Sequence, residues 1–226
     1  MAEQSYETDT FKTAGGDLEL AFLGHGTLMF TYADTVIHID PFSRVADYDA
    51  LPEADLVLIT HEHQDHLDAA ALRAIRTPDT VTILTEACAE KLGDGRVVGP
   101  GDVEEVAGIT IEAVPAYNIA HRRPGGEPFH PQGRGVGYVL TFDDVRVYVA
   151  GDTENTPEMK RLTNIDIAFL PMNLPYTMTP EMVADAAKAF RPKVLYPYHF
   201  GDTDPAKLED LLADEMGIEV RVRDLA

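Results

Sequence analysis

Short apolar segments rich in Val, Ile and Leu alternate along the chain with Ala-rich amphipathic segments. Short apolar runs bounded by turn residues are typical of buried strands, whereas apolar residues recurring every three or four positions predict helices. The pattern predicts helices near 68–76, 86–92, 179–190 and 205–215. It predicts strands near 18–23, 27–32, 35–39, 55–60, 80–84, 108–114, 136–142, 145–150, 166–170, 193–197 and 218–222.

Local signals mark where some of these elements begin and turn. Asp68 and Thr179 directly precede two predicted helices, and such side chains accept hydrogen bonds from the first free backbone N–H groups. Pro180 suits a first helical turn, where its missing N–H is not needed. Phe142-Asp143-Asp144-Val145 predicts a hairpin that joins two strands.

The two halves of the chain repeat one layout. Each half begins with paired strands, reaches an acidic residue at a strand end, and then alternates strands with helices; segments 54–60 and 165–171 occupy corresponding places. This layout predicts an α/β fold in which helices cover the outside of two sheets, a four-layer αββα sandwich. We expect one domain over residues 1–226, with the strand-end motifs meeting at one edge.

Composition narrows the cellular setting. The 226 residues are 45% hydrophobic, and no apolar run approaches the roughly 18 residues expected of a membrane-spanning helix. The acidic, polar segment Met1–Glu7 lacks the apolar core of a signal peptide. Cys88 is the single cysteine and cannot form an internal disulfide, which fits a reducing compartment. We therefore expect a cytoplasmic protein without a membrane anchor.

The net charge of −21 restricts the class of partner. Binding to nucleic acid needs a basic surface that neutralises phosphates, and the sequence has no basic stripe. The same charge disfavours anionic membrane surfaces. These features favour a small-molecule substrate, with assembly into a homo-oligomer left open.

Four potential metal ligands follow the apolar run 55–59 directly: His61, His63, Asp65 and His66. Neutral imidazoles and carboxylates are ligands that Zn²⁺ and similar divalent ions favour. His61 and His63 on one turn can reach one ion, which leaves Asp65 and His66 free to reach a second. The segment therefore predicts a metal site with two ions.

The H-x-H-x-D-H pattern resembles the signature of the metallo-β-lactamase-fold hydrolases. Asp40, Asp152 and His199, each at a predicted strand end, extend the resemblance over nearly the whole chain. The resemblance implies that Asp40 is structural, that Asp152 bridges two metal ions and that His199 completes the second ion's ligands. A narrower resemblance, carried by Phe22-Leu23-Gly24-His25-Gly26 and the compact length, is to the intracellular branch that includes ascorbate-6-phosphate lactonase.

The third ligand of the first ion departs from the family pattern. The family takes a histidine from the loop after the strand near 109–114, and Asn118 stands where that histidine is expected. His121 and His130 follow in the same loop, which is long enough for a functional role. His130 lies between Phe129 and Pro131 on a stiffened backbone, so we favour it, with His121 and Asn118 as alternatives. Asn118 would then contact a ligand or the substrate.

Other residues near the motifs are candidates for catalysis and substrate binding. His25 follows the first predicted strand and, together with Asp65, is a candidate for handling protons. Positive charge is scarce, so Arg122, Arg123 and Arg134, which flank His130 in the same loop, could neutralise an anionic group on the substrate. The candidate substrate contacts are Asn118, Arg122, Arg123, Asn173 and Tyr176.

These observations predict a metal-dependent hydrolase. Two divalent ions, Zn²⁺ first and Mn²⁺, Fe²⁺ or Ni²⁺ as alternatives, can share a water and lower its pKa toward neutrality. The metal-bridged hydroxide would attack a small, anionic ester, lactone or phosphodiester. Two alternatives remain: a metal-binding scaffold or sensor with a degenerate first-metal site, and a nuclease-type phosphodiesterase. The acidic charge speaks against the second of these.

Overall fold

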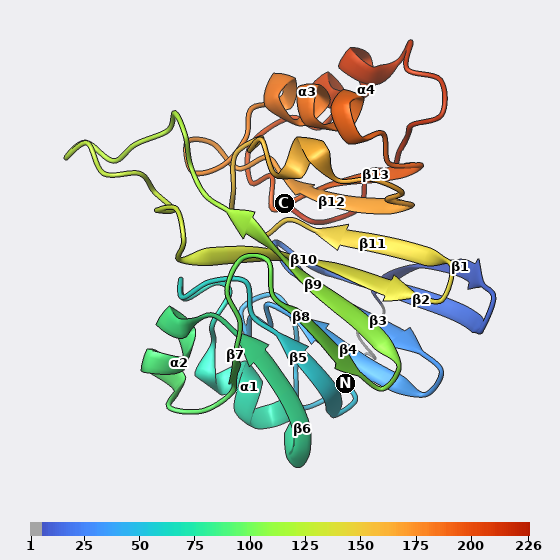
Figure 1. Ribbon diagram of the computed structural model, residues 1–226, viewed down its shortest axis with the longest axis vertical. Coiled ribbons are helices and arrows are strands. Elements are labelled where there is room, and N and C mark those ends of the chain that lie inside the picture. Colours follow the sequence, from blue (N-terminus) through green and yellow to red (C-terminus); the bar gives the residue numbers. More distant parts are fainter. Residues whose placement is uncertain (1–5) are drawn as a thin grey trace.

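The computed structural model describes residues 6–226, which form two seven-stranded sheets packed against each other (Figure 1). The segment Met1–Glu7, on which the prediction about export rests, lies mostly outside these residues. The first sheet contains, in this order, β1 (Glu7–Thr13), β2 (Gly16–Gly24), β3 (Thr27–Tyr32), β4 (Thr35–Ile39), β5 (Ala54–Leu58), β6 (Arg76–Leu84) and β7 (Arg96–Val97). The second contains β8 (Val103–Val106), β9 (Ile109–Ala116), β10 (Gly135–Phe142), β11 (Val145–Val149), β12 (Ile167–Pro171), β13 (Val194–Tyr198) and β14 (Glu219–Val220).

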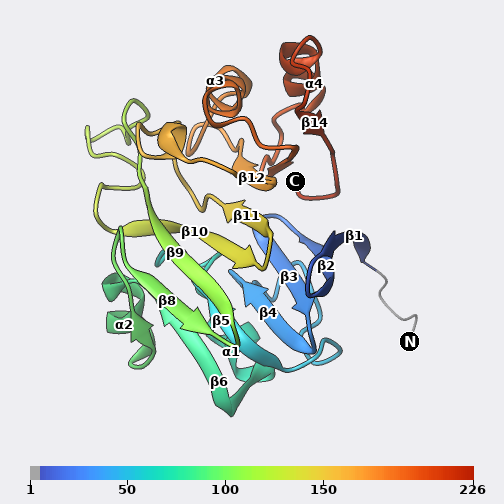
Figure 2. The same cartoon turned by 45° about the vertical axis from the view of Figure 1, so that its right-hand side comes forward.

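Helices cover the outer faces of both sheets (Figures 1 and 2). They are α1 (Ala69–Ile75) and α2 (Glu86–Leu92) on the first sheet, and η1 (Met159–Arg161), α3 (Pro180–Phe190) and α4 (Ala206–Leu212) on the second. The predicted αββα sandwich is confirmed. Among residues 6–226, no helix is long and apolar enough to cross a membrane.

Alternating side chains along the strands assign each face of the first sheet to a different core. In β2, Leu20 and Phe22 belong to the large core shared with the second sheet, whereas Ala21 and Leu23 pack in the core that contains Leu72 of α1. Successive residues of a strand point to opposite faces, so one strand contributes to both cores. Each fully buried apolar side chain of this size stabilises the fold by about 1.5–3 kcal/mol, which fixes the sheets against each other.

The topology brings the motif-bearing loops to one edge. β4, β5 and β6 pair in parallel in the first sheet, as do β11, β12 and β13 in the second. The carboxyl ends of parallel strands meet at the same edge of a sheet, and loops at that edge are where ligands bind in such sheets. The loops after β4, β5, β11 and β13 carry Asp40, the segment 60–66, Asp152 and His199.

Every predicted helix and strand has a counterpart, with shifts at some ends. The strand expected near 80–84 begins earlier, at Arg76, and the helix expected over 205–215 ends at Leu212. The sequence prediction missed β1, β7, β8 and η1. β1 and β8 are edge strands whose side chains alternate between exposed and half-buried positions, so they lack the apolar run on which the prediction depended.

The predicted caps and the hairpin are confirmed. The Asp68 side chain accepts a hydrogen bond from the Ala70 N–H at 2.8 Å, and the Thr179 hydroxyl accepts one from the Met182 N–H at 3.2 Å. Pro180 is the first residue of α3. β10 and β11 pair antiparallel around Asp143, which adopts a positive φ of 51°.

Candidate metal centre

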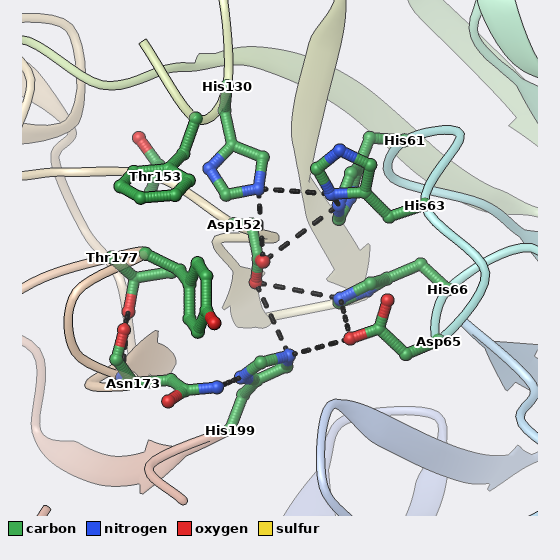
Figure 3. A network of polar contacts seen from close by, with 12 residues as sticks. His61, His63, Asp65, His66, His130, Asp152, Thr153, Asn173, Thr177 and His199 are labelled. Atoms are coloured by element: carbon green, nitrogen blue, oxygen red, sulfur yellow. Dashed lines mark hydrogen bonds and ion pairs between the residues drawn. The ribbon is translucent and has the colours of Figure 1, made fainter. Parts of the chain in front are cut away.

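Asp152 lies at the centre of the candidate site, with ligand-type side chains on two sides of its carboxylate (Figure 3). It lies three residues beyond the end of β11 and is buried. We call His61, His63 and His130 the first cluster, because they approach its Oδ2 atom or one another. We call Asp65, His66 and His199 the second cluster, because the two histidines approach Oδ1 and the Asp65 carboxylate.

The first cluster brings three imidazole nitrogens together. His61 Nε2 lies 3.0 Å and His130 Nε2 lies 3.3 Å from His63 Nδ1. Asp152 Oδ2 lies 3.2 Å from His130 Nε2 and 3.9 Å from His61 Nε2. All four ligand atoms fall within 4.8 Å of one another, a spacing suited to one metal ion.

His130 therefore occupies the place for which the sequence offered three candidates. His121 lies apart from the first cluster, because its Nδ1 is held 2.8 Å from the carbonyl oxygen of Thr177. Asn118 contacts His130 and not the carboxylate of Asp152. The structure thus brings His130 together with His61 and His63, and it gives Asn118 the neighbouring position.

The second cluster surrounds the other oxygen of Asp152. His66 Nε2 and His199 Nε2 lie 3.6 and 3.8 Å from Asp152 Oδ1. Asp65 Oδ2 lies 3.7 Å from His66 Nε2 and 3.4 Å from His199 Nε2. His66 and His199 are buried, and their rings stack with an interplanar angle of 11°. The side chains that the sequence assigned to a second ion are therefore adjacent.

Hydrogen bonds at the far side of three rings direct their Nε2 lone pairs toward the centre. His66 Nδ1–H donates to Asp40 at 2.7 Å, and His130 Nδ1–H donates to Asn118 Oδ1 at 2.8 Å. His61 Nδ1–H donates to the Thr60 hydroxyl at 3.0 Å. A ring that donates at Nδ1 keeps Nε2 unprotonated when neutral, which is the form that binds metals.

Asp40 ties this arrangement to the first sheet, as predicted. Its carboxylate accepts hydrogen bonds from the Thr60 N–H at 2.8 Å and from the Thr60 hydroxyl at 2.6 Å, in addition to His66. The Thr60 hydroxyl in turn accepts from His61. One buried carboxylate therefore orients a histidine of each cluster. His38, two residues earlier in β4, donates to the Pro52 carbonyl instead.

Burial and neighbouring charges change the proton affinities of the clustered groups. Burial lowers the pKa of His61 well below its ordinary value, and burial also lowers the pKa of His63. Burial alone would lower the pKa of His66, but the carboxylates of Asp152 and Asp40 outweigh it and raise the pKa to about 9. Burial would raise the pKa of Asp152, yet the surrounding histidines hold it well below its usual range.

Two buried atoms in the second cluster indicate that a cation fits. His66 Nε2 and Asp152 Oδ1 have no hydrogen-bond partner, although both are buried and lie 3.6 Å apart. Buried polar groups are almost always satisfied, so a facing pair of free lone pairs needs an explanation. A divalent ion accepts both lone pairs, and the imidazole and carboxylate donors suit the ions that the sequence predicts.

Asp65 and His25 form the more open part of the centre. The Asp65 side chain is 35% exposed and that of His25 is 21% exposed. His25 Nε2 lies 3.2 Å from Asp65 Oδ2, and the His25 ring lies 3.8 Å from the ring of His199, centroid to centroid. The candidate for proton transfer is therefore beside the second cluster, where water and substrate can reach it.

Asn173 and Tyr176 belong to the loop that follows β12. Asn173 Nδ2 lies 3.2 Å from His199 Nδ1. Tyr176 is 45% exposed, and its ring packs edge-to-face on Phe129 with centroids 5.0 Å apart. Phe129 also lines a narrow recess that reaches His63 and Asp152. Asn173 therefore contacts the second cluster, and Tyr176 packs on a residue that lines the recess beside the first.

Arg122 and Arg123 do not join the centre. They lie in the loop between β9 and β10, which projects from the body of the molecule as an exposed arm (Figures 1 and 2). Arg122 Nη1 donates to the carbonyl of Gly126 at 3.0 Å, and the Arg123 guanidinium lies 5.1 Å from the centroid of the Phe129 ring. The arm pairs with itself, so these side chains bond within it. Their predicted contact with an anionic substrate stays a prediction.

Three residues of the site escaped the sequence prediction: Thr60, Phe129 and Glu154. Thr60 stands directly before the metal motif and Phe129 directly before His130, so their positions were a usable signal. Glu154 follows Asp152 by two residues, but a glutamate in a loop is ordinarily exposed. Its side chain is 1% exposed here, and nothing in the sequence indicates this burial.

The chain matches known proteins over most of its length. The family model described as β-lactamase superfamily domain matches residues 19–199. A UPF0173 metal-dependent hydrolase of Koribacter versatilis is 36% identical over 200 residues, covering 81% of this chain and 84% of the relative. Another, from Methanopyrus kandleri, is 30% identical over 221 residues, covering 91% and 95% of the two chains.

Solved structures resemble the chain in the same way. A candidate metal-dependent hydrolase from Parabacteroides distasonis is 50% identical and superposes with a TM-score of 0.94, covering 98% of this chain and 100% of the other. Igni18, a metallo hydrolase from Ignicoccus hospitalis, is 25% identical with a TM-score of 0.76 and covers 92% and 96% of the two chains. The similarity therefore extends over more than nine tenths of this chain in both structures.

Proposed function

The chain belongs to the β-lactamase superfamily, and we propose that it is a metal-dependent hydrolase of small esters, lactones or phosphodiesters. One observation carries this proposal. The buried carboxylate of Asp152 lies between two separate groups of ligand-type side chains, and each of its oxygens approaches a different group. A bridging carboxylate of this kind is the arrangement expected of a site for two ions.

The chain's own residues fit two divalent ions. His61, His63 and His130 would hold one ion, and Asp65, His66 and His199 would hold the other, with Asp152 shared. Two such ions, Zn²⁺ first among the candidates, would lower the pKa of a shared water and polarise the bond to be cleaved. The hydrogen bonds from the Nδ1 atoms of His61, His66 and His130 keep these rings in the metal-binding tautomer.

Asp65 and His25 would handle the protons. Asp65 is partly exposed and reaches toward both histidines of the second cluster, so it can orient an attacking water and accept its proton. His25 Nε2 lies 3.2 Å from Asp65 Oδ2, which allows the proton to pass to the imidazole and onward to a leaving group. Burial keeps His61, His66, His130, Asp152 and His199 out of this exchange with bulk solvent.

The part of the substrate that does not react would lie against the loop after β12 and the foot of the arm. Asn173 and Tyr176 remain the proposed contacts there, and Phe129 joins them because it lines the recess beside His63. Arg122 and Arg123 bond within the arm, and Arg134, which lines the same recess, pairs with Glu62, so an anionic and a neutral substrate both stay candidates. A scaffold with a degenerate first site is not favoured, because His130 supplies the missing imidazole.

The proposal is tested by metal content and hydrolysis measured on the same samples. Wild-type protein should bind about two divalent ions per chain by elemental analysis and hydrolyse at least one class in a panel of nitrophenyl esters, lactones and phosphodiesters. His63→Ala should reduce turnover by at least about 100-fold, because even partners outside the ligand set typically cost 10–100-fold. Circular dichroism should show that the variant stays folded.

Two outcomes would contradict the proposal. Two bound ions without turnover of any ester, lactone or phosphodiester would favour a metal-binding scaffold or sensor. Turnover that survives both His63→Ala and chelation would mean that the reaction occurs elsewhere on the molecule. Arg122→Ala serves as a control for mutation near the site, since Arg122 bonds within the exposed arm and should leave turnover unchanged.

A further inference from the structure

Glu154 is a buried carboxylate for which the reaction has no role. Its side chain is 1% exposed and accepts three hydrogen bonds from consecutive backbone N–H groups, those of Ile119, Ala120 and His121, at 2.7, 2.7 and 2.6 Å. Hydrogen bonds to a carboxylate are about twice as strong as those between neutral groups. The chain is therefore wrapped tightly around Glu154 where the arm leaves the sandwich.

Asn118 stands directly before this turn and has both ends of its amide fixed. Its Nδ2 group donates to the Tyr176 carbonyl at 2.8 Å and to Glu154 Oε1 at 3.3 Å. This orientation turns Oδ1 toward His130, where it accepts from the His130 N–H at 2.7 Å and from Nδ1–H at 2.8 Å. The Asn118 N–H donates back to the His130 carbonyl at 2.9 Å. Asn118 thus joins the two ends of the arm, which we call its feet: the segment at Asn118 and the segment at His130.

We propose that Glu154 and Asn118 act as a positioning relay that builds the first metal site, with Glu154 shaping the turn and Asn118 holding His130. The inference rests on the metal centre of the proposed function. His130 lies 12 residues beyond Asn118, across an arm whose residues 122–127 are all exposed. Holding both feet reduces the entropy that an open arm would lose each time His130 engages an ion.

The relay makes a prediction about tautomers as well as position. Oδ1 of Asn118 is an acceptor, so it requires a proton on His130 Nδ1 and leaves Nε2 free for a metal ion. A side chain of the same size without an acceptor would let the proton move to Nε2. A carboxylate at the same place would keep an acceptor for His130 but would lose the N–H₂ group that donates to Tyr176 and Glu154.

The test measures binding of Co²⁺ to metal-free protein by chelator competition and visible absorption, without any substrate. Glu154→Gln replaces one acceptor oxygen by an N–H₂ group that faces backbone donors. It should lower the affinity for one of the two ions by roughly 10–100-fold and leave the affinity for the other unchanged. Asn118→Leu should do the same. Asn118→Asp keeps an acceptor for His130 but turns an oxygen toward the Tyr176 carbonyl and Glu154, so it should weaken binding of the same ion less than Asn118→Leu does. Glu158→Gln is the matched control, because Glu158 accepts from the Tyr117 hydroxyl and not from the turn.

Several results would overturn the relay. Wild-type affinity for both ions in Glu154→Gln would remove Glu154 from it, and equal weakening of both ions would show only a general loss of structure. If Glu154→Gln does not fold, the comparison of Asn118→Leu with Asn118→Asp decides, since equal affinities in that pair contradict the predicted tautomer. The proposed function can fail separately: two tightly bound ions with no hydrolysis would reject the hydrolase and leave the relay standing.

Discussion

The two clusters around Asp152 contain similar ligands but are built in different ways. In the second cluster, His199 directly follows β13 and His66 is backed by Asp40, which directly follows β4. In the first cluster, His130 comes from the far foot of an exposed arm and depends on Asn118 for its place. The ends of the strands therefore position the second cluster, whereas the first cluster also requires the two ends of the arm to be held together.

The largest expected effect comes from removing the ligand that the arm supplies. His130→Ala takes away one of three imidazoles in the first cluster and should reduce the ions bound per chain from about two to about one. Turnover should fall by at least about 100-fold, because loss of a direct ligand exceeds the 10–100-fold typical of an outer partner. Elemental analysis and steady-state kinetics on the same preparation measure both quantities.

This variant also tests whether the two clusters are separable. The remaining ion should keep its affinity, because His66, His199 and Asp65 contact neither the arm nor His130 directly. Retention of two ions in His130→Ala would show that another group, such as His121, completes the first site. Loss of both ions would mean that the second cluster depends on the arm, and the contrast between the clusters would disappear.

A smaller loss of metal affinity is expected from changing Asp40, which supports His66 of the second cluster. Asp40→Asn keeps the shape and suits the positive φ of 47° at this position, since Asn tolerates that backbone region. It replaces an acceptor oxygen by an N–H₂ group among three donors, those of Thr60 N, Thr60 Oγ1 and His66 Nδ1. The second ion should bind about 10–100-fold more weakly in a chelator competition.

Asp40→Asn should affect the first ion less. Asp40 reaches His61 only through the Thr60 hydroxyl, which bonds both side chains. His63 and His130 do not contact Asp40, so two of the three imidazoles keep their orientation. An equal loss at both ions would show that Asp40 supports the centre as a whole. Unchanged affinity for the second ion would show that His66 does not need Asp40 to bind metal.

The same contrast explains how much of the site could be predicted from the sequence. Asp40, Asp152 and His199 each follow a strand, so the predicted strand ends placed them at one edge, and the resemblance to metallo-β-lactamase-fold hydrolases gave them their roles. The choice between His121 and His130 depended on how a long loop closes, which periodicity does not describe. Arg122 and Arg123 lie close to His130 in the sequence, but their side chains contact groups within the arm and no clustered side chain.

Residues whose role depends on burial were the hardest to find. Glu154 looked like an ordinary loop glutamate, and its function as an acceptor for the turn at 119–121 follows only from three-dimensional contacts. The edge strands β1 and β8 were missed for the opposite reason, because exposed strands need few apolar residues. The sequence therefore predicts what the core dictates, and it predicts poorly what loops and edges add.

The smallest expected effect concerns His38, which lies in β4 two residues before Asp40. Burial lowers its pKa from an ordinary 6.5 to about 4 in the folded protein. Between these two values the unfolded chain binds the proton and the folded chain does not, so stability falls as the pH falls through this window. At pH 7.5 both states are neutral here and the effect vanishes, whereas at pH 5 it amounts to roughly 2 kcal/mol.

His38→Gln removes this titration, so the variant should lose less stability than the wild type between pH 7.5 and pH 5. Urea unfolding of metal-free protein at both pH values measures the difference, and the metal ligands, common to both proteins, cancel in the comparison. Parallel losses in the two proteins would show that His38 is not held neutral. Because His38 contacts the Pro52 carbonyl and no clustered ligand, affinity for both ions at pH 7.5 should stay unchanged. A change in stability without a change in metal affinity would show that β4 contributes to folding independently of the metal ligands near its end.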